Sequence, residues 1–147
     1  MLRKSGVYLI DTDVLSELRK KERADPGVRA FFARIEAGQL PVYLSVVTIG
    51  ELRRGIEIIR HRGDKIQAGQ LEGWLQKILA EYEDCILAFD VDSAQMWGRL
   101  RVPHPENALD KQIAATALIH GLTVVTRNER HYQGSGVGVL NPFGSPR

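Results

Sequence analysis

The sequence predicts an α/β protein in which helices cover both faces of a mainly parallel sheet of four to five strands, a three-layer α/β/α sandwich. Two observations predict this class. Short apolar runs rich in β-branched and aromatic residues alternate with longer stretches in which apolar residues recur at helical spacing. Strands that alternate with helices usually lie parallel, because each crossover helix returns the chain to the starting edge of the sheet.

Four apolar runs predict buried strands, and each is flanked by glycine, proline or acidic residues. A fifth, weaker run lies in the glycine-rich end of the chain and predicts an edge strand. The five runs, in order, are residues 7–10, 42–44, 86–89, 122–125 and 137–140.

Helices are predicted where apolar residues share one face between these strands. The faces lie within residues 28–35, 71–82, 94–100 and 113–118, and a turn is predicted at 62–64. The face within 71–82 is broad enough for ordinary core burial, but it could also receive a helix of a partner protein. The face within 113–118 consists largely of small residues, which suits close packing on a sheet.

Composition sets bounds on function without naming one. The 147 residues fit one domain, 1–147, and 44% hydrophobic with 26% charged residues is ordinary for a globular protein. A net charge of +2 permits a polyanionic partner without requiring one. The single cysteine excludes a disulfide framework. No apolar run is long enough to span a membrane, and residues 1–6 lack a secretory signal, so we expect a cytoplasmic protein.

Acidic residues follow the predicted strands. Asp11 ends the first strand, Glu51 comes shortly after the second, and Asp110 opens the last long helix. Because the carboxyl ends of parallel strands meet at one edge of a sheet, these side chains are expected to lie close together. Three converging carboxylates repel one another unless a cation neutralises them, and Mg²⁺ and Mn²⁺ prefer such oxygen ligands.

Each acid also has a structural interpretation. The pattern from Thr48 to Glu51 fits a capping box, and the pattern from Asn107 to Asp110 resembles one, so these acids could satisfy helix amides. Asp13 fits an N-cap better than a metal ligand. The combination of acids after several strands favours the metal site over these separate interpretations.

The chain resembles PIN-domain ribonucleases, and more closely the VapC-type toxins of bacterial toxin–antitoxin pairs. The segments that carry the resemblance span almost the whole chain in the family's order, and they are residues 8–18, 44–52, 110–117, 122–128 and 141–143. The resemblance implies Mg²⁺- or Mn²⁺-dependent cleavage of RNA, with Asp11, Glu51 and Asp110 as the acidic cluster. It also implies a homodimer and inhibition by a cognate antitoxin.

The chain departs from the family's pattern after the fourth strand. Many relatives carry an aspartate at the position of Asn128 or shortly after it, whereas this chain has Asn128 and then His131. An asparagine can ligate through its carbonyl but adds no charge, so the sequence leaves open whether one metal binds or two. Lys111, directly after Asp110, could contact substrate phosphate or face solvent.

The expected mechanism is attack of a water on a phosphodiester, with Asp11 and Asp110 as direct ligands and Glu51 as a third ligand or an acceptor for a coordinated water. Two further groups are expected around this centre. Supporting or weaker candidates near the ligands are Thr12, Asp13, Ser16, Thr126 and Asn128. Candidates for phosphate contact are Arg53, Arg54, Arg127 and Arg130.

Two other functions remain open from the sequence. A PIN-like domain could bind nucleic acid or regulate without efficient catalysis, because the fourth acid is missing. Asp11 and Asp13 also match the strand-ending pattern of haloacid-dehalogenase phosphatases, in which the first aspartate is the nucleophile. Metal-dependent RNA cleavage separates these functions.

Overall fold

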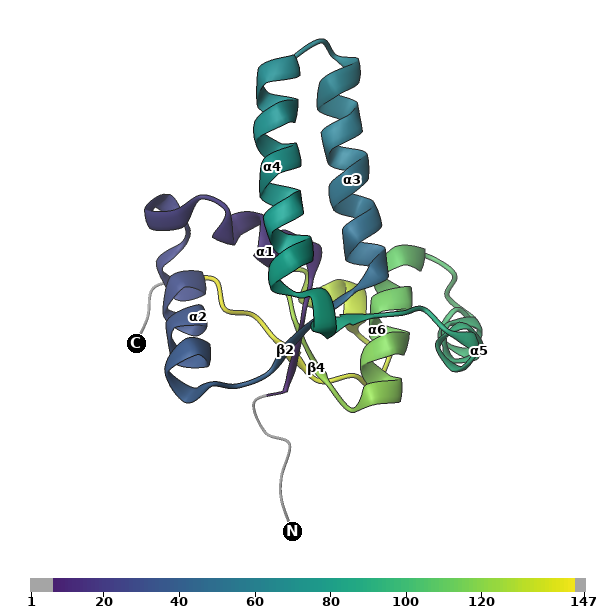
Figure 1. The fold of residues 1–147 in the computed structure, drawn as a ribbon. Helices are drawn as coiled ribbons and strands as arrows, with labels where there is room; N and C mark the ends of the chain where they lie inside the picture. Colours follow the sequence, from purple (N-terminus) through teal and green to yellow (C-terminus); the bar gives the residue numbers. More distant parts are fainter. Residues whose placement is uncertain (1–6, 145–147) are drawn as a thin grey trace.

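The structure is a computed structural model that describes residues 7–144. Residues 1–6, which bear on the expected absence of a leader, and residues 145–147 lie outside the described residues. Five parallel strands form one sheet in the order β3-β2-β1-β4-β5, and helices lie on both sides of it (Figure 1). The predicted α/β class is therefore confirmed. The strands are β1 (Tyr8–Ile10), β2 (Val42–Ser45), β3 (Ile86–Leu87), β4 (Thr123–Val125) and β5 (Val139–Leu140).

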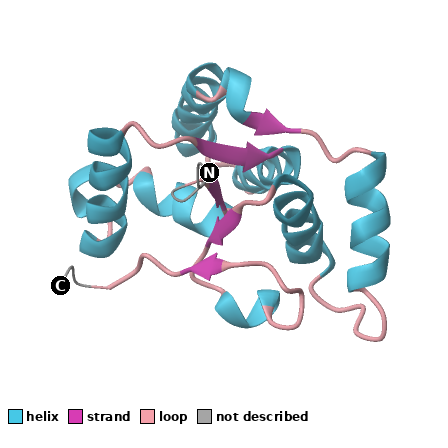
Figure 2. Ribbon diagram, turned by 90° about the horizontal axis from the view of Figure 1, so that it is seen from below, coloured by secondary structure: helices cyan, strands magenta, loops and turns pink. Residues whose placement is uncertain are grey.

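The chain order reverses at the central strand, β1. Tyr8 pairs with Val42 of β2 on one side and with Thr123 of β4 on the other. In open parallel sheets, ligands bind beyond the carboxyl ends of the strands at such a reversal, because the connections diverge there and leave a crevice. The segment directly after Ile10 therefore occupies the position where a site is expected. Figure 2 shows the strands and the surrounding helices from a second direction.

Six α-helices and three short 3₁₀ helices connect the strands. The α-helices are α1 (Thr12–Leu18), α2 (Pro26–Gly38), α3 (Val46–His61), α4 (Lys65–Glu81), α5 (Val91–Leu100) and α6 (Ala108–His120). The 3₁₀ helices are η1 (Lys21–Arg23), η2 (Glu83–Cys85) and η3 (Glu129–Tyr132). None of the helices within residues 7–144 is long and apolar enough to cross a membrane.

Alternate residues of the central strands face two separate cores. Ile10 and Val125 lie in a core with buried side chains of α1 to α4, whereas Leu9 and Val124 lie in a second core against α6. Successive side chains of a strand point to opposite faces of the sheet, so strands buried on both faces read as continuous apolar runs. This is why the strands could be recognised in the sequence.

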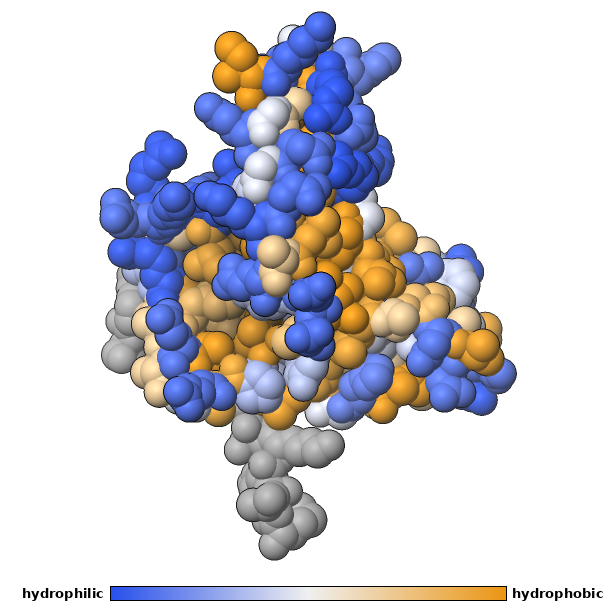
Figure 3. Space-filling view, in the orientation of Figure 1, coloured by the Kyte–Doolittle hydropathy of each residue, from blue (hydrophilic) through white to orange (hydrophobic). Residues whose placement is uncertain are grey.

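Helices α3 and α4 form a pair that projects beyond the sheet (Figure 1). The predicted turn at 62–64 joins them. Leu75, Ile78 and Tyr82 are buried in the first core, as ordinary core burial predicts. Figure 3 shows mainly hydrophilic residues over the outer part of the pair, and hydrophobic residues gathered on the body below it.

The predicted caps differ from those in the structure. Ser45, not Thr48, is the N-cap of α3, and its hydroxyl accepts from the amide of Val47 at 3.0 Å. Glu51 is consequently inside the helix rather than in a capping box. Asp13 also lies inside a helix, because Asp11 is the N-cap of α1. Both α1 and α3 begin directly after a strand, which places their caps earlier than the sequence pattern suggested.

Candidate active site

Asp11 is the buried centre of the site. It follows β1 directly, and its amide donates to the carbonyl of Val125 at 2.9 Å, so the backbone fixes its position between two strands. Its Oδ1 accepts from the amide of Thr12 at 2.7 Å. Its Oδ2 accepts from the hydroxyls of Thr126 at 2.8 Å and Tyr132 at 2.9 Å. Asp11 is 3% exposed, and it is held by its neighbour Thr12 and by two hydroxyls that lie 115 and 121 residues away in the sequence.

The carboxyl of Asp11 has an unusual acidity. Burial, and after it the charge of Asp13, raise its pKa to about 6, although the hydrogen bonds from Thr126 and Thr12 act in the opposite direction. The charge of Asp110 also contributes to the raised pKa. No basic side chain contributes to the pKa of Asp11, so the protein itself supplies no cation that compensates the charge of the ionised carboxylate.

Asp13 adds a second carboxylate beside Asp11. Its Oδ2 accepts from the amide of Arg127 at 3.0 Å, whereas its Oδ1 is buried without a hydrogen-bond partner. Burial raises the pKa of Asp13, and the charge of Asp110 adds to this effect. A buried carboxylate oxygen without a partner is costly and indicates that water or a cation completes the site.

Asp110 lies in the first turn of α6, and its Oδ2 is 2.5 Å from Nδ1 of His131 in η3. Its charge raises the pKa values of Asp11 and Asp13 and contributes to the raised pKa of Tyr132, which shows that it faces the same centre. The sequence prediction that Asp110 approaches Asp11 agrees with this arrangement.

Glu51 is joined to the centre through a threonine. Its Oε1 accepts from the hydroxyl of Thr12 at 2.7 Å, and that hydroxyl is also 3.1 Å from the hydroxyl of Thr48. Thr12 directly follows Asp11, so Glu51 is linked to the residue beside the buried carboxylate rather than to the carboxylate itself.

The donor set suits a hard divalent cation. Asp11, Asp13 and Asp110 supply carboxylate oxygens, one of them buried without a partner, and mutual repulsion contributes to the raised pKa values. Within residues 7–144, however, no group of three histidine, cysteine or acidic side chains lies close enough together to hold a metal ion. The side chains thus fit a cation that takes part of its coordination from water or substrate.

The supporting candidates are placed around this centre. The hydroxyl of Thr126 donates to Asp11 and accepts from the amide of Asn128 at 3.0 Å. The side chain of Asn128 is exposed. Ser16 lines a small groove together with Thr12 and Glu51.

The four arginine candidates for phosphate contact have different surroundings. Arg53 donates to both carboxylate oxygens of Glu72, each at 2.6 Å, so a phosphate would have to compete with this pair. The guanidinium of Arg127 lies 4.0 Å from the ring centre of Phe143. Arg54 and Arg130 are exposed.

Two site residues were not predicted as such from the sequence. Tyr132 hydrogen-bonds Asp11 across a sequence separation of 121 residues, and His131 contacts Asp110 across 21. Their signal in the sequence was only their position in a short polar segment after β4. Lys111 was expected to face phosphate or solvent, but it is buried and its Nζ donates to the carbonyl of His104.

The fold has five parallel strands and one buried aspartate, Asp11, where the strand order reverses. The PIN domain family matches residues 8–136. The chain therefore belongs to the PIN domain family.

Among individual proteins, the VapC ribonuclease Y4jK of Sinorhizobium fredii is 32% identical over 144 residues, 93% of this chain and 98% of the relative. The toxin FitB of Neisseria gonorrhoeae is 34% identical over 143 residues, 93% of this chain and 99% of the relative. The crystal structure of FitAcB from Neisseria gonorrhoeae superposes with a TM-score of 0.77 at 31% identity, covering 92% of this chain and 97% of that one.

Proposed function

We propose that this protein is a Mg²⁺- or Mn²⁺-dependent endoribonuclease and the toxin of a type II toxin–antitoxin pair. The observation that carries the proposal is the buried Asp11, which accepts from the hydroxyls of Thr126 and Tyr132 and lies beside the charges of Asp13 and Asp110. Similarity to a VapC ribonuclease over nearly the whole chain supports the same activity.

In this proposal Asp11 and Asp110 hold the cation directly, and Glu51 is a third ligand or accepts from a coordinated water. The unpartnered oxygen of Asp13 is a further candidate for contact with water or cation. The chemistry that Mg²⁺ or Mn²⁺ supplies at such a site is acidification of a water and stabilisation of the negative charge that develops on the phosphate oxygens.

The remaining residues keep these carboxylates in position. Thr126 and Tyr132 donate to Asp11 and orient its Oδ2, while the backbone of Thr12 orients its Oδ1. His131 contacts Asp110 in the same supporting role. Such outer contacts fix the direction in which a ligand presents its oxygens. Among the arginine candidates, Arg54, Arg127 and Arg130 remain proposals for phosphate contact, as does Arg53 if the phosphate displaces Glu72.

We also infer a cognate antitoxin, a homodimer and a cytoplasmic location. Solved relatives include FitAB bound to a DNA fragment, which superposes with a TM-score of 0.79 at 29% identity, covering 95% of this chain and 98% of that one. Sedimentation of the purified chain should give the mass of a dimer. Co-expression with the antitoxin should yield a complex in which RNA cleavage is suppressed.

The catalytic proposal is tested with single-stranded RNA in Mg²⁺, in Mn²⁺ and in a chelator. The wild type should cleave with either metal and not in the chelator, and Asp11→Asn and Asp110→Asn should each lose cleavage. Asp92→Asn is the matched control, because Asp92 is exposed on α5. Cleavage that survives in both site variants would contradict the assignment.

The same samples separate the alternatives. A wild type that binds RNA without cleaving it in either metal would support a non-catalytic domain. Hydrolysis of a phosphomonoester with trapping of a phosphorylated Asp11 would instead support a phosphatase, which has no support from the family match.

A further inference from the structure

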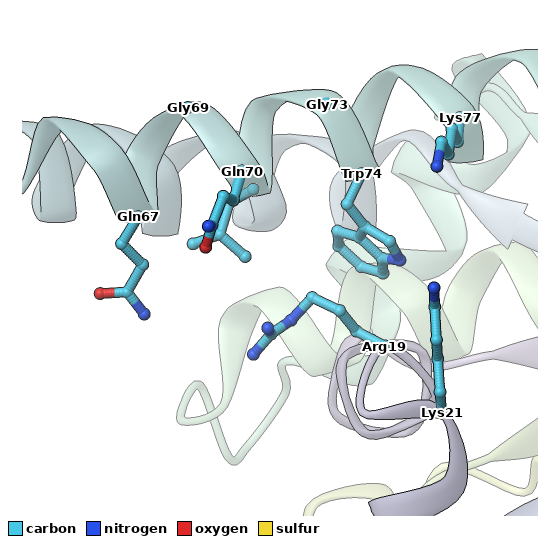
Figure 4. A pocket seen from close by; sticks show the side chains of 9 residues that line it. Arg19, Lys21, Gln67, Gly69, Gln70, Gly73, Trp74 and Lys77 are labelled. Atoms are coloured by element: carbon cyan, nitrogen blue, oxygen red, sulfur yellow. The ribbon is translucent and has the colours of Figure 1, made fainter.

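A basic pocket lies between α4 and the segment in which α1 ends and η1 begins (Figure 4). We call it the basic pocket and define it by Arg19, Lys21, Gln67, Gln70, Trp74 and Lys77. Its volume is about 540 Å³, and its lining contains three cations and two amides but no acidic residue. The proposed mechanism makes no use of these side chains.

The cations of the basic pocket lack acidic partners. Among the ion pairs of residues 7–144, none involves Arg19, Lys21 or Lys77. Arg53, by contrast, is paired with Glu72. Figure 4 shows Lys21 and Lys77 extending toward one another from opposite walls. Two facing ammonium groups repel unless an anion lies between them, so the pocket is arranged for a negatively charged occupant.

Trp74 gives the basic pocket an aromatic surface. Its indole projects from α4 into the pocket and lies above Arg19 in Figure 4. Gly69 and Gly73 leave open space on the same helix, since a Cβ at either position would meet no atom within 4 Å. Trp74 is half-buried: it packs against the first core and also lines the pocket. An aromatic ring that faces a pocket beside cations is the combination that binds single-stranded nucleic acid, with the base stacked and the backbone phosphates paired.

The basic pocket adjoins a smaller groove beside the candidate active site. This groove of about 190 Å³ is lined by Thr12, Ser16 and Glu51 at one end. Arg19 and Trp74 line both this groove and the basic pocket. A nucleic-acid strand whose reacting phosphate lies at the acidic site can therefore extend through the groove to the cations of the basic pocket.

We propose that the basic pocket is a subsite for the single-stranded RNA that the active site cleaves. Arg19, Lys21 and Lys77 bind backbone phosphates, and Trp74 stacks on a base next to them. The inference rests on the proposed ribonuclease function, and it assigns the substrate a direction away from the acids along α4. An acidic protein segment would use the same cations but would not need the indole, so stacking distinguishes the two occupants.

Lys21 offers a well-matched variant. Its backbone φ is +56°, a left-handed conformation that glycine adopts more easily than lysine. Lys21→Gly therefore removes the charge while suiting the backbone, so a loss of RNA affinity in this variant reports the missing charge rather than backbone strain. Lys77→Gln and Trp74→Leu test two further contacts, and Trp74→Phe retains an aromatic ring. Arg34→Gln on α2 is the control, because it removes one exposed charge outside the pocket.

The experiment measures binding of a fluorescent oligoadenylate to the full chain in a chelator, so that no cleavage occurs. Lys21→Gly and Lys77→Gln should each weaken binding severalfold and reduce the slope of log affinity against log salt by about 0.7. Trp74→Leu should weaken binding about tenfold, Trp74→Phe less, and wild-type tryptophan fluorescence should be quenched by RNA. Arg34→Gln should bind like the wild type.

The outcomes separate this inference from the proposed function. Wild-type affinity for RNA in Lys21→Gly, Lys77→Gln and Trp74→Leu would overturn the subsite, even if cleavage still depends on Asp11. If the pocket variants weaken RNA binding but the wild type cleaves no RNA, the ribonuclease proposal is wrong and the RNA-binding subsite is retained. If an oligoglutamate peptide binds as tightly as the oligoadenylate and shows the same dependence on Lys21 and Lys77, the occupant is an acidic protein segment and the RNA assignment fails.

Discussion

At the scale of single residues, Asp11 shows how a functional charge opposes the stability of the fold. Burial raises its pKa to about 6 from an ordinary value of 3.8. The protonated form is therefore favoured by folding: this stabilisation is complete below the ordinary pKa and is lost as the pH rises through about 6. A bound cation would offset this loss of stability, because it stabilises the ionised form of Asp11.

This predicts a pH-dependent difference between the wild type and Asp11→Asn without metal. As the pH rises from about 5 to about 7.5, the wild type should lose about 1 to 2 kcal/mol of unfolding free energy relative to the variant. Urea unfolding at the two pH values measures the difference. Parallel pH profiles for the two proteins would show that Asp11 ionises normally.

His131 is predicted to act by positioning Asp110. His131→Ala removes the contact with Asp110 Oδ2, and cleavage should fall about 10- to 100-fold, as is typical when a residue supporting a metal ligand is lost. His131→Asn, which keeps a side-chain donor, should recover part of the loss. The affinity for Mn²⁺ should likewise be highest in the wild type, lower in His131→Asn and lowest in His131→Ala. Equal metal affinity in all three proteins would argue against a positioning role.

The sequence identified residues of this site unevenly. Asp11 could be predicted because it ends an apolar strand, and Asp110 because it begins a helix near the same sheet edge. Tyr132 could not, since an aromatic residue in a polar segment carries no sign that its hydroxyl reaches a carboxylate 121 residues away. Glu51 was predicted as a ligand, whereas its hydrogen bond to Thr12 depends on how α1 and α3 pack.

At the scale of elements, the projecting α3 and α4 pair is joined at its surface by ion pairs. Glu72 of α4 accepts from both Arg53 and Arg60 of α3. Its hydrogen bonds, first with Arg53 and then with Gln76, lower the pKa of Glu72 to about 2. Ionised Glu72 therefore stabilises the pair above its ordinary pKa, and this contribution is lost as the pH falls toward 2.

Hydrogen exchange can test this contribution. In the wild type, amide protection in the outer turns of α3 and α4 should decrease as the pH is lowered, after correction for intrinsic exchange rates. Glu72→Gln should show reduced protection already at neutral pH and a smaller acid effect. Glu106→Gln is a control for charge removal, because Glu106 is exposed in the loop before α6. The idea fails if Glu72→Gln exchanges like the wild type at neutral pH.

Element types were easier to predict than element ends. The strands were recognised from their apolar runs, but β3 ends at Leu87 whereas the run extends to Phe89. Helix starts were misplaced for a related reason. Ser45 serves both as the last residue of β2 and as the cap of α3, and a cap inside a strand has no separate pattern in the sequence.

At the scale of the whole molecule, the segment 142–144, which we call the final segment, closes over the start of α2. Asp25 is the N-cap of α2, and its Oδ1 accepts from the amides of Gly27 and Gly144. A Cβ at Gly27 would lie 2.1 Å from the carbonyl oxygen of Pro142 and 2.3 Å from that of Gly144. The backbone of the final segment therefore requires glycine at position 27.

Gly27→Ala should accordingly destabilise the protein by about 1 to 3 kcal/mol, because backbone atoms must shift to admit the methyl group. Gly98→Ala on α5 is the matched control: a Cβ there meets no atom within 4 Å, and alanine should stabilise the helix by roughly 0.5 to 1 kcal/mol. Thermal unfolding of the two variants gives both values. Equal melting temperatures would show that the final segment is not held against α2.

The overall class followed from the alternation of strands and helices, because that pattern is local in the sequence. The placement of β1 between β2 and β4 is not local, and it determines which distant residues meet. The sheet order therefore had to come from the structure, and with it the contact between the start of α1 and the segment after β4.

The central position of β1 also has a consequence for synthesis of the chain. Asp11 is made early, but the hydroxyls that orient it belong to Thr126 and Tyr132, which follow it by 115 and 121 residues. A nascent chain still lacking β4 carries the central acid without its supports, and Asp110 has no His131 beside it. The carboxylates of the candidate site can therefore reach their final arrangement only after Tyr132 has been synthesised and η3 has folded against the centre.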